Sequence, residues 1–142
     1  MINIFVAGVP QPKGSTTHFR GRITSANPQL KDWEDSIRSN LFANRCAMIL
    51  GPVTVDLGFW LPQPPSRMPR PRSKDPLKRH PIPDVKPDVD KLVRACLDAF
   101  TNTVIQDDAR VVLIAAYKTY VGQGESPGVR IKIHPYPTLE VR

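Results

Sequence analysis

Cysteine and histidine are scarce in this sequence, and neither residue type is clustered. The 2 cysteines, Cys46 and Cys96, stand far apart with no repeated spacing, which excludes a disulfide framework and indicates a reducing compartment. Both lie in apolar helical patterns, so we expect buried free thiols. The 3 histidines, His18, His80 and His134, are scattered, which leaves no His/Cys cluster for zinc.

Long hydrophobic runs are also missing. No apolar stretch approaches the roughly 20 residues of a membrane span, and the segment 1–6 has no positive charge before its apolar residues, as a signal peptide would. We therefore expect a cytoplasmic protein, encoded by a bacterium or a phage. With 142 residues, 40% of them hydrophobic and 23% charged, the chain is predicted to form a single globular domain over residues 1–142.

Acidic residues are the minority among the charged ones. The chain has 13 Asp and Glu against 20 Lys and Arg, a net charge of +7. A basic surface attracts polyanions, and nucleic acid is the commonest such partner. The alternative is an ordinary globular protein with a solvated basic face.

The spacing of apolar residues predicts four strands and two main helices. Alternating apolar residues predict strands, and apolar residues three or four apart predict helices. The expected strands are Ile2–Val9, Val53–Leu61, Val111–Val121 and Gly128–His134, and the expected helices are Gln29–Arg45 and Asp88–Phe100. The turn residues 122–128 suggest that the last two strands form a hairpin. This order predicts an α+β fold, a small mixed sheet with two helices packed on it.

A long loop rich in proline and arginine separates the second strand from the second helix. Residues 62–87 contain nine of the 16 prolines, which excludes a helix or a central strand and predicts an extended, mobile loop. Its basic cluster over residues 67–79 consists of Arg67, Arg70, Arg72, Lys74, Lys78 and Arg79, and only Asp75 lies among them. One interpretation is a plain solvated linker. We favour a DNA-contacting arm, because charge of one sign needs a partner to order it.

Two further basic positions follow the first strand in a second loop, which is predicted over residues 10–17 and continues into a basic stretch. Lys13 lies within that loop, and Arg20 and Arg22 come shortly after it. We expect these three side chains to contact nucleic acid together with those of the longer loop.

The few acidic residues gather in two places, at Asp88 with Asp90 and at Asp107 with Asp108. Asp88 stands at the expected helix N-cap, so capping alone explains it. Capping does not require Asp90 in the first turn. A chain return that brings Asp108 near this pair creates a carboxylate cluster, which stays ionised only if a cation intervenes. Oxygen ligands suit Mg²⁺ or Mn²⁺, and such an ion among basic residues suggests phosphodiester hydrolysis.

Arg94 follows Asp90 by one helical turn, and Asp98 follows Arg94 by another. This spacing allows Arg94 to point towards the expected metal site. It equally allows a simple ion pair between Arg94 and Asp90 or Asp98. We expect Asp98 to have a structural or orienting role.

The stretch around the acidic residues resembles a known family. Lys86-Pro87-Asp88-Val89-Asp90-Lys91-Leu92, then Asp98-Ala99, then Asp107-Asp108, resemble the pattern of the RusA family of Holliday-junction resolvases. The last strand, the stretch Val6 to Lys13 and Trp33 resemble the family too, so the resemblance covers most of the chain. It implies a homodimer with a RusA-like fold that makes paired symmetric nicks across four-way DNA junctions, in recombination and repair, with Mg²⁺ or Mn²⁺.

The resemblance also implies roles for individual residues. The family's metal-binding aspartates fall on Asp88, Asp90 and Asp108, with Asp107 as neighbour. Its basic catalytic position falls on Arg94, where lysine is usual, and its strand lysine falls on Lys118. Lys86 and Lys91 complete the expected DNA-binding set, although position 91 is usually asparagine. Arg94 retains the positive charge of the usual lysine but does not exchange protons. The chain is therefore active if the family lysine serves only as a charge, and its activity is in question if that lysine transfers a proton.

Two other functions stay open at this point. A DNA-binding module without catalysis uses the acidic residues only as caps, and shows no Mg²⁺-dependent nicking. A related nuclease acts on other branched DNA and is separated from a resolvase only by comparing substrates. A scaffold role leaves the acidic residues unexplained.

Overall fold

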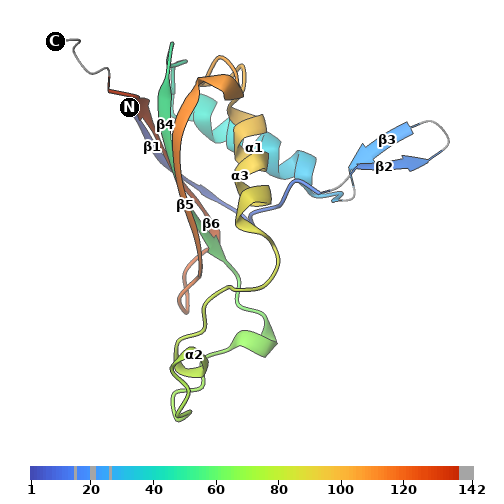
Figure 1. Cartoon of the computed structure of the whole chain (residues 1–142), viewed down its shortest axis with the longest axis vertical. Coiled ribbons are helices and arrows are strands. Elements are labelled where there is room, and N and C mark those ends of the chain that lie inside the picture. Colours follow the sequence, from blue (N-terminus) through green and yellow to red (C-terminus); the bar gives the residue numbers. More distant parts are fainter. Residues whose placement is uncertain (15, 20–21, 26, 138–142) are drawn as a thin grey trace.

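The computed structural model describes residues 1–14, 16–19, 22–25 and 27–137 (Figure 1). The strands are β1 (Ile2–Ala7), β2 (Thr16–Phe19), β3 (Arg22–Ser25), β4 (Val53–Leu61), β5 (Val111–Tyr120) and β6 (Gly128–Pro135). The α-helices are α1 (Leu30–Ala43), α2 (Pro76–Arg79) and α3 (Val89–Phe100), and the 3-10 helices are η1 (Pro65–Arg67) and η2 (Asp108–Arg110). The expected α+β class is confirmed.

Four strands form one mixed sheet in the order β1-β6-β4-β5. β4 and β5 run parallel, whereas β6 is antiparallel to both of its neighbours. The expected hairpin of the last two strands is therefore wrong, because β4 lies between β5 and β6. Seven of the nine residues of β4 are buried, a pattern typical of a strand with neighbours on both sides. Local turn chemistry carries no information about this insertion.

Helices α1 and α3 pack on the same face of the sheet (Figure 1). The buried stripe of α1 consists of Leu30, Trp33, Ile37 and Leu41. Phe42, which the spacing also assigned to this stripe, is 85% exposed. The helix ends at Ala43, so Cys46 lies beyond it and is half-buried, whereas Cys96 of α3 is buried; both thiols are free.

The two predicted loops contain short regular segments. η1 and α2 interrupt the stretch 62–87, which the sequence assigned no helix. Both begin with proline in the first turn, where its missing N–H is not needed, and the Asp75 carboxylate caps α2 by accepting a bond from the backbone N–H of Leu77. β2 and β3, which the sequence did not predict, form an antiparallel pair that projects beside α1 (Figure 1).

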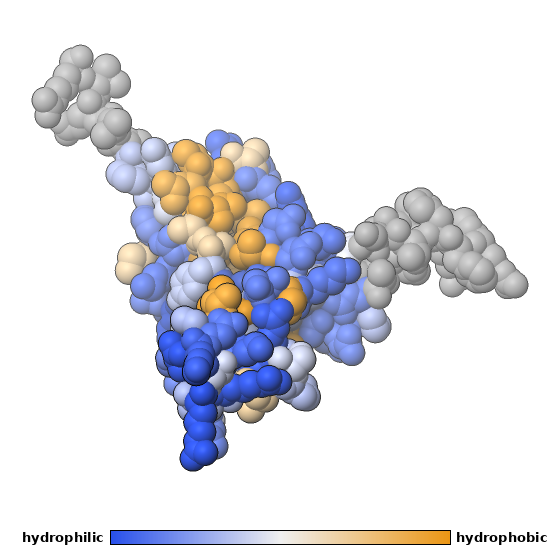
Figure 2. Space-filling model, turned by 60° about the horizontal axis from the view of Figure 1, so that its bottom comes forward, coloured by the Kyte–Doolittle hydropathy of each residue, from blue (hydrophilic) through white to orange (hydrophobic). Residues whose placement is uncertain are grey.

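β5 is an edge strand, and most of it is exposed. Its residues 112–117 are exposed, among them Val112, Leu113, Ile114 and Tyr117. Figure 2 shows hydrophobic side chains gathered on one face of the molecule, beside a strongly hydrophilic region. A long apolar edge of this kind is typical of a surface that pairs with another chain. None of the described helices has the length and apolar character needed to cross a membrane.

Candidate active site

The N-terminus of α3 presents two carboxylates. Asp88 has the extended backbone of an N-cap residue, yet its side chain accepts no capping hydrogen bond. Its nearest charged neighbour is the Lys91 ammonium, whose Nζ lies 3.8 Å from Asp88 Oδ2. Asp90 follows in the first turn, is exposed, and has no hydrogen bond or ion pair with any residue that the structure describes. Both carboxylates are therefore open to a ligand from solvent, and capping does not account for Asp88.

Asp108 contacts the same helix further along. Its Oδ2 accepts a hydrogen bond of 2.6 Å from Arg94 Nη1, and its Oδ1 lies 2.8 Å from the hydroxyl of Thr101, which caps the end of α3. Because Arg94 is four residues after Asp90, these contacts place Asp108 on the same side of α3 as Asp90. Arg94 thus bonds neither of the partners that helical spacing suggested.

The remaining acidic residues near the site are engaged in the fold. Asp107 caps η2, since its carboxylate accepts a 2.7 Å bond from the backbone N–H of Ala109. Asp98 pairs with Lys13, whose Nζ lies 3.1 Å from Asp98 Oδ2. The backbone N–H of Lys13 also donates to the carbonyl of Lys91 at 2.9 Å. Lys13 therefore attaches the segment after β1 to α3. If Lys13 also binds DNA, its ammonium has to contact a phosphate in addition to Asp98 or in place of it.

The aspartates do not form one closed cluster. In the part of the chain that the structure describes, no three His, Cys, Asp or Glu side chains stand close enough to hold a metal ion. The reason is the length of α3: eleven residues separate Asp90 from Thr101, about 16 Å at the helical rise, and Asp108 lies at the Thr101 end. The pair Asp88 and Asp90 fits Mg²⁺ by its donor chemistry, since both are carboxylates that accept no hydrogen bond from a described residue and the Lys91 ammonium lies 3.8 Å from Asp88.

Lys118 fixes the segment that leads into α3. It lies on the face of β5 that carries the helices, and its Nζ donates to the carbonyls of Val85 and Pro87, each at 2.7 Å. Pro87 directly precedes Asp88, so these two bonds hold the backbone in front of Asp88 in position. The sequence assigned Lys118 to DNA, whereas in the structure its ammonium contacts the protein backbone.

The basic side chains of the stretch 62–87 divide into two groups. Arg67 pairs with Asp84, an acid that the sequence analysis missed, and Arg79 donates to the carbonyl of Ser73 at 2.9 Å. Four others are exposed and form no ion pair with any described residue: Arg70, Arg72, Lys74 and Lys78. The stretch projects past the sheet on the side where α3 begins (Figure 1). The free positive charge is thus carried by the segment around α2, which Figure 1 shows well away from the first turn of α3.

The other predicted basic residues lie in three settings. Lys86 and Lys91 are exposed and flank Asp88. Arg22 begins β3, but its side chain is outside the described part of the structure, and Arg20 lies outside the described residues altogether.

A second cluster of charged side chains lies between α1 and α3. Arg38 of α1 pairs with Glu34 and Asp35 and donates to the backbone carbonyl of Asp98 at 3.3 Å. Burial raises the pKa of Glu34, and the nearby Lys13 ammonium opposes that shift. These residues couple the two helices. Sequence analysis missed them, as it missed Thr101, because the partners come from separate elements.

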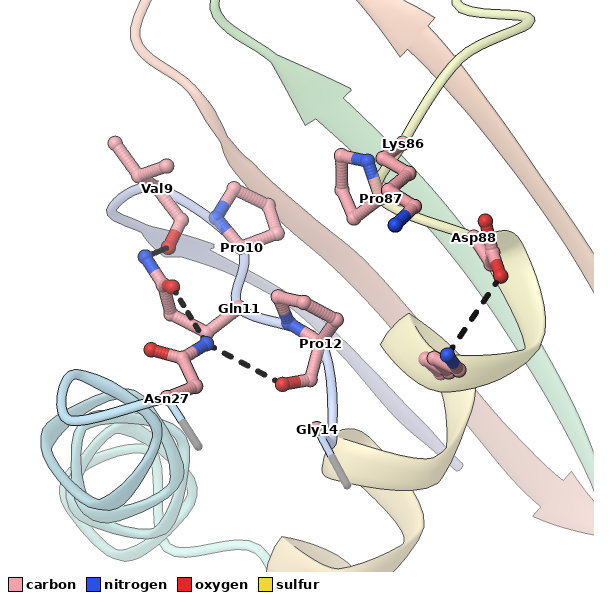
Figure 3. Close-up of a pocket in the computed structure, with 10 residues that line it drawn as sticks. Val9, Pro10, Gln11, Pro12, Gly14, Asn27, Lys86, Pro87 and Asp88 are labelled. Atoms are coloured by element: carbon pink, nitrogen blue, oxygen red, sulfur yellow. Dashed lines mark hydrogen bonds and ion pairs between the residues drawn. The ribbon is translucent and has the colours of Figure 1, made fainter. Parts of the chain in front are cut away.

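A pocket opens beside the first turn of α3. Its volume is about 470 Å³, and its lining residues are Val9, Pro10, Gln11, Pro12, Gly14, Asn27, Lys86, Pro87, Asp88 and Lys91. Figure 3 shows Pro10 and Pro12 on one side and Lys86, Pro87 and Asp88 on the other. Asp88 therefore belongs to the wall of a concave site, and residues 9–12, part of the stretch Val6 to Lys13 noted in the sequence, lie across from it.

Comparisons with known proteins agree with the resemblance seen in the sequence. Residues 6–134 match the family model described as Endodeoxyribonuclease RusA. A relative that is 28% identical over 143 residues is the uncharacterized protein YqaN of Bacillus subtilis (strain 168); the match covers 93% of this chain and 94% of that protein. The family match begins within β1 and ends within β6, and it includes the whole candidate site.

Proposed function

The chain belongs to the RusA endodeoxyribonuclease family, and from that premise we propose that it resolves four-way DNA junctions by Mg²⁺-dependent hydrolysis, in recombination and repair. The observation that carries the proposal is the pair Asp88 and Asp90 at the start of α3. Both carboxylates lack a hydrogen bond with any described residue, and the exposed lysines Lys86 and Lys91 line the same pocket as Asp88. Two neighbouring carboxylates, of which only Asp88 has an ion-pair partner, repel DNA, so their place at a DNA-binding surface is best explained by a bound cation.

In this proposal Asp88 and Asp90 hold the ion. Asp108, with Asp107 as its neighbour, joins them as the third ligand only if its carboxylate leaves Arg94 and Thr101 and moves towards the start of α3. A divalent ion held there would supply a Lewis acid for the scissile phosphate and activation of the water molecule that acts as nucleophile. Lys86 and Lys91 hold phosphate oxygens on either side of Asp88. Lys118 keeps Asp88 in place through the Pro87 carbonyl.

Arg94 has two roles in the proposal. Before DNA binds, it neutralises Asp108 through the 2.6 Å hydrogen bond. With DNA bound, its guanidinium stabilises negative charge that develops on the phosphate. Arg94 therefore acts as a charge, and the proton for the leaving oxygen comes from solvent.

We further propose that two copies act together through their β5 edges. Symmetric nicks in two strands require two sites related by a twofold axis, and an isologous interface supplies that axis. The exposed apolar residues 112–117 support β5 as the contact.

The test compares cleavage with binding on synthetic four-way junctions, flaps and duplexes, each with and without Mg²⁺. Asp90→Asn is expected to lower junction cleavage below detection and leave junction affinity within about threefold, because phosphate contacts dominate binding. Asp32→Asn is the matched control, since Asp32 is the exposed acid in the first turn of α1. It should cut like the unmodified protein.

Three results contradict the proposal in different ways. If Asp90→Asn loses binding and cleavage in step, Asp90 supports the surface instead of the chemistry. If the unmodified protein binds junctions but never nicks them with Mg²⁺ or Mn²⁺, it is a DNA-binding module. If flaps are cut faster than junctions, the substrate is another branched DNA.

A further inference from the structure

The pocket beside Asp88 has the surface of a site for a flat, partly apolar ring. Val9, Pro10, Pro12 and Pro87 supply rigid apolar walls, and the volume of about 470 Å³ lies within the range of small-molecule sites. Proline rings have no rotamers to order, so a planar group docks on them with little loss of side-chain entropy.

The charged residues of the pocket lie on one wall. Lys86, Asp88 and Lys91 come from the segment that begins α3, opposite the wall made by Pro10 and Pro12 (Figure 3). An occupant that places an anion against the lysines and an apolar ring between the prolines satisfies both walls. A nucleotide has this division, because its phosphate and its base are joined through one sugar.

Gln11 adds a polar group with a fixed orientation. Its Nε2 donates to the Val9 carbonyl at 3.1 Å, and its Oε1 accepts from Asn27 Nδ2 at 3.0 Å. A side-chain amide has two N–H donors and two lone pairs, so each end of the Gln11 amide retains capacity for one more hydrogen bond. A donor and an acceptor side by side match the hydrogen-bonding edge of a nucleobase.

We propose that this pocket takes one unstacked nucleobase of the DNA, the base next to the phosphate at Asp88, and that Gln11 makes the cut depend on which base it is. The inference rests on the proposed function for the nature of the substrate. Bases at a branch point have fewer stacking neighbours than bases in duplex, so extruding one is easier there. The pocket therefore gives the enzyme a way to choose the position of the cut within a junction.

The first experiment detects the unstacked base directly. Four-way junctions carrying a single 2-aminopurine at successive positions around the crossover are titrated with the full-length protein in EDTA, so that no strand is cut. Unstacking is expected to raise the 2-aminopurine fluorescence severalfold at one position in each symmetric strand. Cleavage of the same junctions after Mg²⁺ addition should then fall next to that position.

Val9→Phe fills the pocket without removing the bond that Val9 makes through its backbone carbonyl to Gln11. Val9 is 48% exposed, so the larger ring does not disturb the core. The variant should lose the fluorescence rise and keep junction affinity within about threefold, since phosphate contacts dominate affinity. Leu50→Phe, at a side chain 72% exposed and outside the pocket lining, is the control and should keep the rise.

Gln11→Ala tests base selection without blocking the pocket. On junctions that differ only at the identified position, the ratio of cleavage rates between best and worst base should shrink by about tenfold, the size typical of one bidentate contact. Gln123→Ala, in an exposed turn outside the pocket lining, should leave the ratio unchanged.

The outcomes separate this inference from the proposed function. Saturated binding with no fluorescence rise at any position overturns the base pocket, and cleavage on Mg²⁺ addition then shows that the nuclease proposal survives. A rise that Val9→Phe retains places the unstacked base elsewhere and also overturns it. A rise that is lost in Val9→Phe supports the pocket even if Mg²⁺ produces no nick, which would overturn only the nuclease proposal.

Discussion

At the scale of single residues, the two hydrogen-bond partners of Asp108 determine whether its carboxylate is available to a metal ion. The carboxylate bonds to Arg94 and Thr101 from two turns of one helix. A cation that binds Asp108 has to share or displace the guanidinium. The two partners keep Asp108 ordered and neutralised in the free protein, and they make its use as a ligand depend on what else enters the site.

Arg94→Met should separate stability from activity. The ion pair is exposed, with side chains 52% and 38% accessible, so its removal should change the free energy of unfolding by less than about 1 kcal/mol. Junction cleavage should fall by about 100-fold, because the charge that stabilises the phosphate is gone. Thermal melting and single-turnover cleavage measure the two effects.

Arg94→Lys serves as the matched comparison, since lysine keeps the charge. It should recover most of the cleavage. If Met and Lys variants are equally inactive, the planar guanidinium itself is required and the role of simple charge is wrong.

The sequence predicts where the two aspartates stand on α3 better than it predicts the contacts of the surrounding side chains. The N-terminal position of Asp88 and Asp90 follows from the apolar spacing of α3, because helix starts have local signals. The partners of Arg94, Lys13 and Arg67 do not follow, since long side chains reach residues that only the fold brings near. Helical spacing offered Asp90 and Asp98 for Arg94, yet the carboxylate that bonds it comes from η2.

At the scale of elements, β5 and the stretch 62–87 act on α3 together. Lys118 of β5 bonds two carbonyls of the chain just before the helix, so the sheet fixes the point where the basic stretch ends and the helix begins. The basic side chains further back are left free of the fold. One end of the stretch is therefore anchored and the other presents charge.

Lys118→Met should lower the cleavage rate by about 10- to 100-fold, because removing both bonds lets the backbone before Asp88 shift, and small misplacements cost rate steeply. Junction affinity should change little. The comparison is Lys132→Met, which removes an exposed lysine from β6. An equal drop of affinity and rate in Lys118→Met would instead indicate direct DNA binding by this lysine.

Replacing Arg70, Arg72, Lys74 and Lys78 by alanine tests the basic stretch. All four are exposed and unpaired among the described residues, so the melting temperature should hold. The slope of log affinity against log salt should decrease by about 0.9 for each phosphate that these side chains neutralise in the unmodified protein. An unchanged slope would remove this stretch from the DNA-binding surface.

The elements themselves were predictable to different degrees. α1 and α3 follow from their apolar stripes, and β1, β4, β5 and β6 follow from alternation or apolar content. Their arrangement does not, because the insertion of β4 between β5 and β6 depends on long-range burial. β2 and β3 were not predicted, because their polar residues show no alternation with apolar ones.

At the scale of the whole molecule, the exposed edge strand β5 is the surface that we expect to bind a second copy of the chain. Leu113 and Tyr117 lie on one face of the strand, Ile114 lies on the other, and all three are exposed. A strand that is apolar on both faces and unpaired at its edge is a hazard unless another chain covers it.

Ile114→Lys should therefore convert a dimer into a monomer. Sedimentation at micromolar concentration should give twice the chain mass of 15.9 kDa for the unmodified protein and the chain mass for the variant. Leu50→Lys, also exposed but outside β5, should remain dimeric. A monomeric unmodified protein would contradict the proposed interface and leave the metal site to be judged separately.

The strand order also governs when the molecule can be completed. β1, the first strand to leave the ribosome, has β6 as its neighbour in the sheet, and β6 is the last strand made. The opening strand consequently waits for nearly the whole chain to be synthesised, and sheet closure follows translation instead of accompanying it. Nascent chains are thus at risk of aggregation or proteolysis until β6 has been made and pairs with β1.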